Sequence, residues 1–315
     1  MHQQKRLMIK IAKMYYEEGL TQQVISERLR LSRPRVSRLM HDAIEQGIVK
    51  ISIESEPGSQ IQLEQQLEDK FGLLEAVVVE ISEPITYETV SATLGAAAAQ
   101  HFQQVVVDGD IIGLTWGSTL ASMVENLNQE KKPNCLVVQL VGGLGDPNTN
   151  THATDLVSRT AMALSAKMSL MPAPGVVSSA DSAKLLCSDR YISQALDLVK
   201  KTDVAFIGIG ATERNSLLMR NEQIITWKEM EQLRTAGAVG DMSLHFYDVN
   251  GNQVGLDLDK RVIGISFKDM KEIKRKVGIA GGPEKYLAVL GAIRGGLINS
   301  LVTDKQTAER LISEV

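Results

Sequence analysis

The sequence is poor in aromatic residues and in cysteine, and it has no long uninterrupted hydrophobic run. Aromatic residues make up 4% of the chain and hydrophobic residues 43%, so its core must be built mainly from aliphatic side chains. Two cysteines in apolar stretches, Cys135 and Cys187, exclude a disulfide framework and predict buried free thiols. No stretch approaches the roughly 20 apolar residues of a membrane span, and no signal-peptide core is evident. These absences predict a soluble cytoplasmic protein.

Signatures of metal binding and of nucleophilic catalysis are also missing. The Gly208–Glu213 segment begins like a dinucleotide-binding fingerprint but lacks its third glycine. No Ser–His–acid set is evident, and the histidines show no metal-ligand spacing, so each is expected to be structural or exposed. The five histidines are His2, His41, His101, His152 and His245. We therefore expect no metal and no bound cofactor.

Charge is distributed unevenly along the chain. The net charge is −4, but residues 1–50 hold ten Lys and Arg against five acidic residues, a balance of +5. Residues 51–315 therefore carry −9. A basic N-terminal module on an acidic body confines attraction for phosphate to one end of the chain.

The N-terminal module has the pattern of a helix-turn-helix. An amphipathic helix is predicted over residues 5–18, and residues 21–40 read as two short helices joined by a tight turn. Thr21 and Ser32 are the predicted caps of these two helices. Pro34 stands early in the second, where its missing N–H costs nothing.

The second helix of this pair carries the predicted DNA-reading face. Its apolar side, Val36, Leu39 and Met40, points back at the first helix. Residues 28–38 contain five arginines and no carboxylate, and an arginine-rich, hydroxyl-bearing face suits the major groove of DNA. An ordinary solvated helical hairpin is the alternative. The predicted DNA contacts are Gln22, Ser32, Arg33, Arg35, Ser37 and Arg38.

Period-two alternation over residues 48–54 predicts a short strand, which makes residues 1–54 a winged helix-turn-helix domain. Pro57 marks a break in composition, and residues 55–315 form the second domain, with residues 55–72 as its linker and first helix. The apolar residues of that helix are equally compatible with core packing and with self-association, because two-fold DNA readers need dimers.

The second domain alternates apolar strands with helices. Strands that are apolar on both faces indicate a mainly parallel, Rossmann-like α/β sheet covered on each side. Strands are predicted over 76–81, 110–116, 134–141, 204–209, 277–280 and 298–302. Helices are predicted over 91–106, 118–127, 153–165, 189–201 and 284–295, with a last one that begins at a capping box in 303–306.

Ligands in such a sheet bind beyond the carboxyl ends of the strands. One of these ends, Gly113–Thr119, combines a glycine with two hydroxyls at a helix start. Gly117 lets backbone N–H groups turn toward a ligand, and Ser118 and Thr119 add hydroxyls, which favours a phosphate or another anion. The lysine of a nucleotide P-loop is absent. A tight turn with Ser118 as a simple N-cap is the alternative.

Two further strand ends are rich in small and polar residues. Residues 141–150 are dense in glycine and side-chain amides, which suit sugar hydroxyls, although alone this segment reads as a surface loop. In residues 278–285, Lys285 stands in the first turn of a helix, where a cation opposes the helix dipole unless an anion binds there. Asp241, from an apolar stretch, could accept from sugar hydroxyls or pair with Lys285.

Several motifs in this chain occur together in one known family. They are Tyr15–Gln22, Ser32–Leu39, Gly208–Gly210, Gly237–Asp241, and Gly278–Gly282 with Lys285. This combination covers essentially the whole chain and resembles the SorC-type sugar-binding transcriptional regulators. The resemblance implies a winged helix-turn-helix followed by a domain related to glucosamine-6-phosphate deaminases, ribose-5-phosphate isomerases and CoA transferases. It also implies a tetramer, arranged as a dimer of dimers, and a sugar or sugar-phosphate effector, such as sorbose, sorbitol or a phosphate of either.

The family's effector contacts can be placed on this sequence residue by residue. The anion loop falls on residues 117–119 and the ring of Trp116 on the face of the sugar. Trp116 stands where some relatives have Gly or Phe, which leaves the size of the pocket open. Residues 178–181 are expected to border the pocket. The predicted effector contacts are Trp116, Gly117, Ser118, Thr119, Asp241 and Lys285.

The sequence therefore predicts a sequence-specific DNA-binding transcriptional regulator of a carbohydrate-utilisation operon, controlled by a sugar or sugar phosphate and without enzymatic activity. One alternative is a sugar-phosphate isomerase or deaminase with an appended DNA-binding module, for which Asp241 is the only evident general base. Another is a constitutive DNA-bound scaffold with a degenerate sugar pocket. Operator, effector, and activation or repression stay open.

Overall fold

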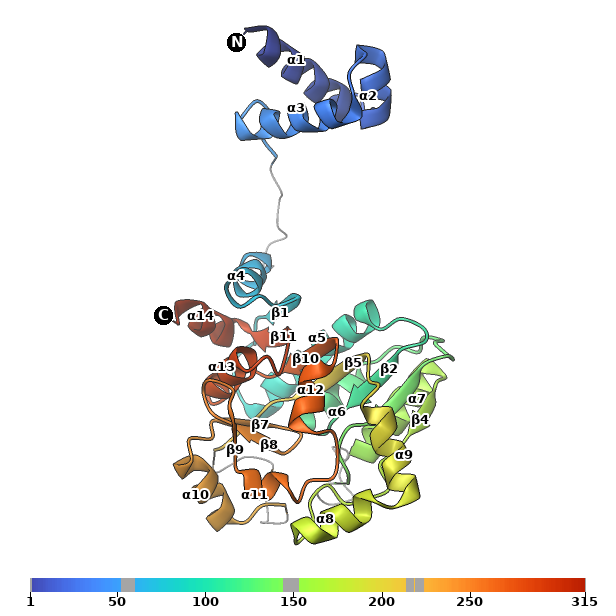
Figure 1. Ribbon diagram of the computed structural model, residues 1–315. Helices are drawn as coiled ribbons and strands as arrows, with labels where there is room; N and C mark the ends of the chain where they lie inside the picture. The colour runs from blue at the N-terminus through green and yellow to red at the C-terminus, as the bar shows by residue number, and fades with distance from the viewer. Residues whose placement is uncertain (1, 52–59, 144–152, 214–217, 219–223, 315) are drawn as a thin grey trace. The chain divides into compact units, whose positions relative to one another are not determined.

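The computed structural model describes residues 2–51, 60–143, 153–213, 218 and 224–314 (Figure 1). Contacts divide the chain into two compact units, Met1–Ser59 and Gln60–Val315, and each is described by itself. Within the described ranges, no helix is long and apolar enough to cross a membrane.

The N-terminal unit is a small helical bundle. The predicted first helix is divided, because α1 runs into a π-helical turn, η1, before Gly19 adopts a left-handed conformation (φ 67°). The core contains Met8, Ile11, Met14, Ile25, Val36, Leu39, Met40 and Ala43. The elements are α1 (His2–Ala12), η1 (Lys13–Glu17), α2 (Gln22–Leu29) and α3 (Arg33–Glu45).

The two predicted caps of the helix-turn-helix differ. The Thr21 side chain accepts a hydrogen bond from the backbone N–H of Val24. Ser32 occupies the N-cap position of α3, but its side chain makes no capping hydrogen bond. Residues 48–51 belong to no strand, and residues 52–54 of the predicted wing lie outside the described residues.

A seven-stranded parallel sheet is the centre of the C-terminal unit, with the order β1-β11-β10-β5-β2-β3-β4. The chain proceeds from β2 outward to β4, then returns to β5 on the other side of β2. Strand order therefore reverses between β2 and β5. The strands are β1 (Glu75–Val79), β2 (Ile111–Leu114), β3 (Leu136–Gln139), β4 (Lys167–Ser169), β5 (Val204–Gly208), β10 (Arg275–Ile279) and β11 (Ser300–Asp304).

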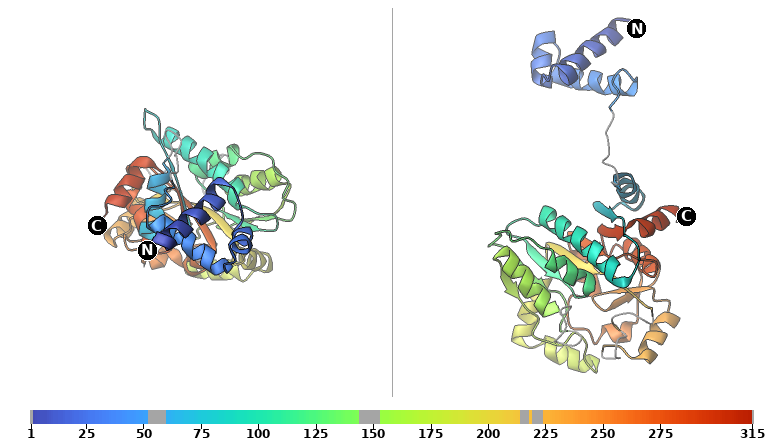
Figure 2. Two further views of the ribbon diagram at one scale, coloured as in Figure 1. Left: turned by 90° about the horizontal axis from the view of Figure 1, so that it is seen from above. Right: turned by 180° about the vertical axis from the view of Figure 1, so that it is seen from behind.

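Helices cover both faces of this sheet, and β5 shows why a central strand is apolar on both faces. Val204 and Phe206 pack with α5, α6 and α7, on the side seen from behind in Figure 2. Ala205 and Ile207 belong to the core on the other face, with α9, α12, α13 and α14. The helices are α4 (Ile61–Phe71), α5 (Tyr87–Val105), α6 (Ser118–Glu125), α7 (Ala153–Leu164), α9 (Arg190–Val199), α12 (Phe267–Glu272), α13 (Tyr286–Arg294) and α14 (Lys305–Ser313).

A second, antiparallel sheet, which the sequence did not predict, follows directly from β5. Its strands have two or three residues each, too few for a recognisable alternation. Pairing of β6 with β7 brings Asp241 opposite Gly210, at the carboxyl end of the parallel sheet. The remaining elements are β6 (Gly210–Ala211), β7 (Gly240–Met242), β8 (His245–Tyr247), β9 (Gln253–Val254), α8 (Ala180–Cys187), α10 (Trp227–Thr235) and α11 (Leu256–Asp259).

Three sequence-based details need correction. The last helix has no capping box at residue 303, because Thr303 lies in β11 and Asp304 caps α14 by accepting from the backbone N–H of Thr307. The helix predicted from residue 91 begins at residue 87, after a capping box of Thr86 and Thr89. Cys187 is only partly buried, whereas Cys135 is buried, and both are free thiols.

Candidate functional site

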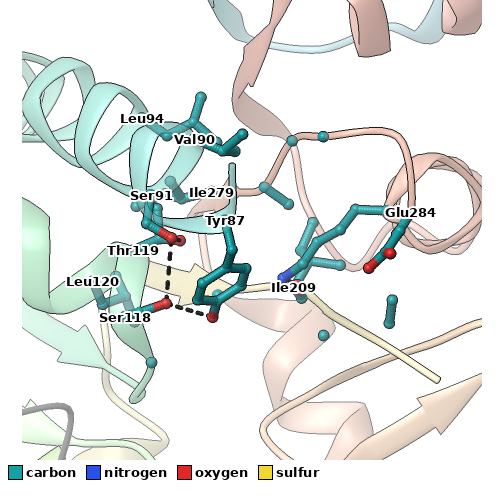
Figure 3. A pocket seen from close by; sticks show the side chains of 18 of the residues that line it. Tyr87, Val90, Ser91, Leu94, Ser118, Thr119, Leu120, Ile209, Ile279 and Glu284 are labelled. Atoms are coloured by element: carbon teal, nitrogen blue, oxygen red, sulfur yellow. Dashed lines mark hydrogen bonds between the residues drawn. The ribbon is translucent and has the colours of Figure 1, made fainter. Parts of the chain in front are cut away.

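A cavity of about 600 Å³ lies where the strand order reverses, the position expected for a ligand in an open parallel sheet. Its walls come from the segments that follow β2, β5 and β10 and from the start of α5 (Figure 3). The structure brings together all six predicted effector contacts, since Trp116, Gly117, Ser118, Thr119, Asp241 and Lys285 line this one cavity.

The start of α6 forms one wall of the cavity. Gly117 is the N-cap residue, and its backbone (φ 130°, ψ 162°) lies in a region that is essentially restricted to glycine. Ser118 is the first residue of the helix rather than its cap. The first backbone N–H groups of a helix have no intrahelical acceptor and carry partial positive charge. This wall can therefore receive an anion.

A chain of hydroxyl groups extends this wall toward α5. The Ser118 hydroxyl lies 2.5 Å from the phenol oxygen of Tyr87 and 3.4 Å from the Ser91 hydroxyl. Thr119 donates to Ser91 over 3.5 Å (Figure 3). Sequence reasoning missed Tyr87 and Ser91, because α5 meets α6 only in the fold. The capping pair before Tyr87 marks a helix start but gives no sign of a ligand.

Asp241 is a buried carboxyl on the wall formed by the second sheet. Burial raises its pKa from 3.8 to about 6, although the Lys285 charge, the N–H of Leu244 and the His245 charge oppose that rise. Burial lowers the pKa of Lys285, which the charge of Asp241 partly offsets. The ammonium group of Lys285 donates to the Ile209 carbonyl over 2.5 Å, so it is directed toward the end of β5.

Gly210 is required next to this carboxyl. A Cβ atom at this position would lie 1.9 Å from Oδ1 of Asp241, so no other residue fits without displacing it. The second glycine of the Gly208–Gly210 motif, which starts like a dinucleotide fingerprint, is therefore explained by the close approach of Asp241, whereas a Cβ at Gly208 would lie 3.3 Å from the Trp116 carbonyl oxygen.

The cavity combines hydroxyls, helix N–H groups, the cation of Lys285 and three carboxyl groups with apolar surface; the carboxyl groups are Glu213, Asp241 and Glu284, and the apolar residues include Ile85, Val90, Leu94 and Ile279. Such a lining suits a small polyhydroxylated ligand with an anionic group. In the part of the chain that the structure describes, no cluster of His, Cys, Asp and Glu could hold a metal ion.

Other predicted pocket residues are not brought to the cavity. Residues 178–181 are absent from its lining, and Ser179 instead caps α8 by accepting from the N–H of Ser182. Gly142 and Gly143 do not line it either, and the rest of the glycine-rich loop, residues 144–150, lies outside the described residues.

The predicted DNA-reading residues lie on the exposed side of the helix-turn-helix. Arg33, Arg35, Ser37 and Arg38 are exposed on α3, while Val36 on the opposite side is fully buried. Among the described residues, these three arginines form no ion pair with a carboxylate. Ser32 is exposed, and Gln22 at the start of α2 is partly exposed.

Known proteins of similar sequence and structure agree with both parts. Residues 55–313 match the family described as "Putative sugar-binding domain", and residues 10–46 match region 4 of sigma-70. The sorbitol operon regulator of Klebsiella pneumoniae is 33% identical over 315 residues, covering 98% of each chain. The deoxyribonucleoside regulator of Bacillus subtilis (strain 168) is 32% identical over 317 residues, covering 99% of each. The crystal structure of full-length SorC from Klebsiella pneumoniae superimposes with a TM-score of 0.75 at 32% identity, covering 98% of this chain and 99% of that one.

A helix-turn-helix joined to a sugar-binding α/β domain defines a DNA-binding transcriptional regulator with a sugar effector, not an enzyme. The chain belongs to the SorC-type sugar-binding transcriptional regulators. The predicted family, the fold class of a helix-turn-helix with a mainly parallel α/β domain, and the regulatory function are confirmed.

Proposed function

We propose that the cavity binds a phosphorylated sugar and that this binding controls how the protein binds its operator. One observation carries the proposal. The walls of one cavity contain the start of α6, with Gly117 and two hydroxyls, together with the buried Asp241 and the partly buried Lys285, which are distant from it in sequence. The helix start would hold the phosphate, and Asp241 would accept from sugar hydroxyls. Trp116 would cover a face of the sugar.

The names of two relatives suggest where to look for the effector. The Klebsiella relative is a sorbitol operon regulator and the Bacillus relative a deoxyribonucleoside regulator. We propose sorbitol, sorbose and their phosphates as the first candidates and phosphorylated deoxyribose as the second. The phosphates are preferred over the neutral sugars, because a helix N-terminus favours an anion.

On the DNA side, we propose that residues 1–54 form the DNA-binding domain and residues 55–315 the effector domain. Gln22, Ser32 and the exposed face of α3 would contact phosphates and base edges. The protein would act in the cytoplasm as a tetramer, in which pairs of DNA-binding domains contact the two halves of an operator. As in Klebsiella, where the relative is named for its operon, the target would be a carbohydrate-utilisation operon.

A thermal-shift screen of the full chain tests the effector proposal. The probes are sorbitol, sorbose, sorbitol 6-phosphate, 2-deoxyribose 5-phosphate and inorganic phosphate. A specific sugar phosphate at one hundred times its Kd should stabilise the protein by about 2.7 kcal/mol, whereas the matching neutral sugar should give little change.

Two variants separate the sites in this screen. Lys285→Met should lose the stabilisation and keep operator binding, because its ammonium lies in the cavity and not on the DNA-reading helix. Lys305→Ala, which removes an exposed ion pair to Glu80 outside this cavity, should respond like the wild type. Equal stabilisation of wild type and Lys285→Met would remove Lys285 from the site, and equal stabilisation by sorbitol and its phosphate would contradict the phosphate preference.

A further inference from the structure

The C-terminal helix α14 is attached to the effector cavity at its first residues. The carboxylate of Asp304, its buried cap, accepts from the backbone N–H of Gly282 over 2.6 Å and from the Thr307 hydroxyl over 2.7 Å. The approach is so close that a Cβ at Gly281 would lie 2.3 Å from Oδ2 of Asp304. Gly281 and Gly282 line the cavity, whereas Asp304 does not. One carboxylate therefore ties a cavity wall to the start of α14.

The same cavity segment is held again further along α14. Arg310 donates to the Pro283 carbonyl over 3.3 Å, and its guanidinium lies 4.1 Å from the centre of the Tyr286 ring. The phenol of Tyr286 donates to the carboxylate of Glu314, just beyond the end of the helix. Residues 281–286 are therefore contacted from the start of α14 by Asp304, from within the helix by Arg310, and from just beyond its end by Glu314.

The far end of α14 is fastened to α4. The ammonium group of Lys70 donates to the carbonyl of Ile312 over 2.8 Å and also to that of Glu314. These carbonyls belong to the last turn of α14 and its end, where helical carbonyls lack intrahelical donors. The two helices also pack against each other, which is visible in Figure 1.

Helix α4 is itself fixed to the edge of the parallel sheet. Strand β1 is an edge strand, and its outward-facing N–H groups at Ala76 and Val78 donate to the carboxylates of Glu68 and Glu64, each over 2.9 Å. Leu67 between them is fully buried. The sequence was equally compatible with core packing and with self-association of this helix. In the structure, α4 packs on its own domain. It is also the first element of the C-terminal unit, reached from the DNA-binding unit through residues 52–59.

We propose that α14 couples the effector cavity to α4, with Asp304, Arg310 and Lys70 as the positioning residues that transmit the change. Movement of residues 281–286 on effector binding shifts α14, and Lys70 passes that shift to the helix from which the chain continues to the DNA-binding unit. The inference rests on the proposed effector site. Coupling of this kind in regulators changes the affinity of the second site by about 5- to 150-fold.

Hydrogen–deuterium exchange of the full chain tests this coupling, with the cavity segment disturbed in two independent ways. Gly282→Ala disturbs it from within, since Gly282 has a φ of 92° and a Cβ there strains the backbone while meeting nothing closer than 3.8 Å. The second disturbance is the addition of sorbitol 6-phosphate to the wild-type chain. In an otherwise wild-type chain, Gly282→Ala should change the exchange rates of residues 280–290, 305–313 and 61–71, by about threefold or more in α4.

The positioning residues decide the outcome. In Arg310→Met and in Lys70→Met backgrounds, Gly282→Ala should still alter residues 280–290, whereas its effect on α4 should be clearly weaker, since only Asp304 and the packing of α14 on α4 remain. Lys305→Ala, on the same helix, removes a side chain whose ion pair among the described residues is with Glu80 at the surface, and it should transmit the change as the wild type does. The proposal would be overturned if Gly282→Ala alone produced no response in α4. It would also be overturned if that response were equally large in the Arg310→Met and Lys70→Met backgrounds.

The two proposals fail separately in this design. If sorbitol 6-phosphate leaves residues 280–290 unchanged while Gly282→Ala reaches α4 through Arg310 and Lys70, the coupling is supported and that effector is rejected. If the sugar phosphate protects residues 280–290 and α4 responds regardless of Arg310 and Lys70, the effector site is supported and the coupling by α14 is rejected.

Discussion

At the scale of single residues, Asp241 shows how the cavity keeps a carboxyl group away from water. It is 6% exposed, and its nearest support is a backbone N–H from Leu244 and the charge of Lys285. Since the ammonium of Lys285 donates to the Ile209 carbonyl, the carboxyl group has little direct hydrogen bonding of its own. The cavity therefore holds a group that gains from partners supplied by a ligand.

Replacement of Asp241 by Asn should make stability less dependent on pH. The folded-state pKa of about 6 lies above 3.8, so the folded protein binds this proton more tightly than the unfolded chain does. That stabilisation is complete below pH 3.8 and is lost as the pH rises through 6. Because one pKa unit corresponds to about 1.4 kcal/mol and part of the effect is already lost at pH 4, wild type should lose about 2 kcal/mol relative to Asp241→Asn between pH 4 and pH 7.

Urea denaturation of both proteins at the two pH values measures this difference. Glu284→Gln, which removes an exposed carboxylate at the rim of the same cavity, controls for the loss of one negative charge. A gap between wild type and Asp241→Asn that stays constant from pH 4 to pH 7 would show that the carboxyl titrates alike in the folded and unfolded chain.

At the scale of elements, the sequence predicted the central apolar strands and the helices between them, but not β4, α8, α10 or α12. Strands β2, β5 and β10 are buried on both faces, so their apolar runs identify them without alternation. The strands β6 to β9 could not be found, because a strand of two or three residues has no measurable period. Their order depends on contacts that form only after β5 is in place.

The residues of the candidate site follow the same rule, since those with an unusual local sequence were predicted and those that depend on the fold were not. Residues 117–119 and Lys285 were found because their local context is unusual, a glycine with hydroxyls at a helix start and a cation at another. Asp241 was found as a carboxylate in an apolar stretch. Tyr87 was not, since 31 positions separate it from Ser118, its hydrogen-bond partner. Contacts between helix starts that are distant in sequence need the fold before they can be seen.

The exposed side of α3 gives a prediction for DNA binding. The operator is first selected from a random DNA pool. Arg35→Ala should weaken binding to it by about 1–3 kcal/mol, because Arg35 is exposed on the side of α3 that is proposed to contact DNA, whereas its neighbour Val36 is buried. Thermal stability and the effector response should be unchanged. Arg35→Lys separates two roles, since lysine replaces arginine in a phosphate contact but not in a bidentate contact with a base. Unchanged operator affinity of Arg35→Ala in a gel-shift titration would assign the DNA-reading face elsewhere.

At the scale of the whole molecule, the chain joins a basic unit to an acidic one. Residues 1–50 carry +5 and residues 51–315 carry −9, so the net charge favours attraction to the DNA backbone only in the N-terminal part. A single small unit makes few phosphate contacts, so in the proposed tetramer the joining of several units would strengthen their combined binding to DNA.

The salt dependence of operator binding measures how many units hold the DNA at once. Each phosphate contact contributes about −0.9 to the slope of log K against log salt concentration. If Arg33 contacts a phosphate and two units bind each operator, Arg33→Ala should reduce the magnitude of the slope by about 2, whereas a single bound unit would give a reduction of about 1. Arg190→Ala, an exposed arginine of the C-terminal unit, should leave the slope unchanged. Fluorescence anisotropy with the full chain separates these cases when it is measured at salt concentrations from about 50 to about 300 mM. A reduction near 1 would show that one helix-turn-helix binds each operator and would contradict the two-fold arrangement.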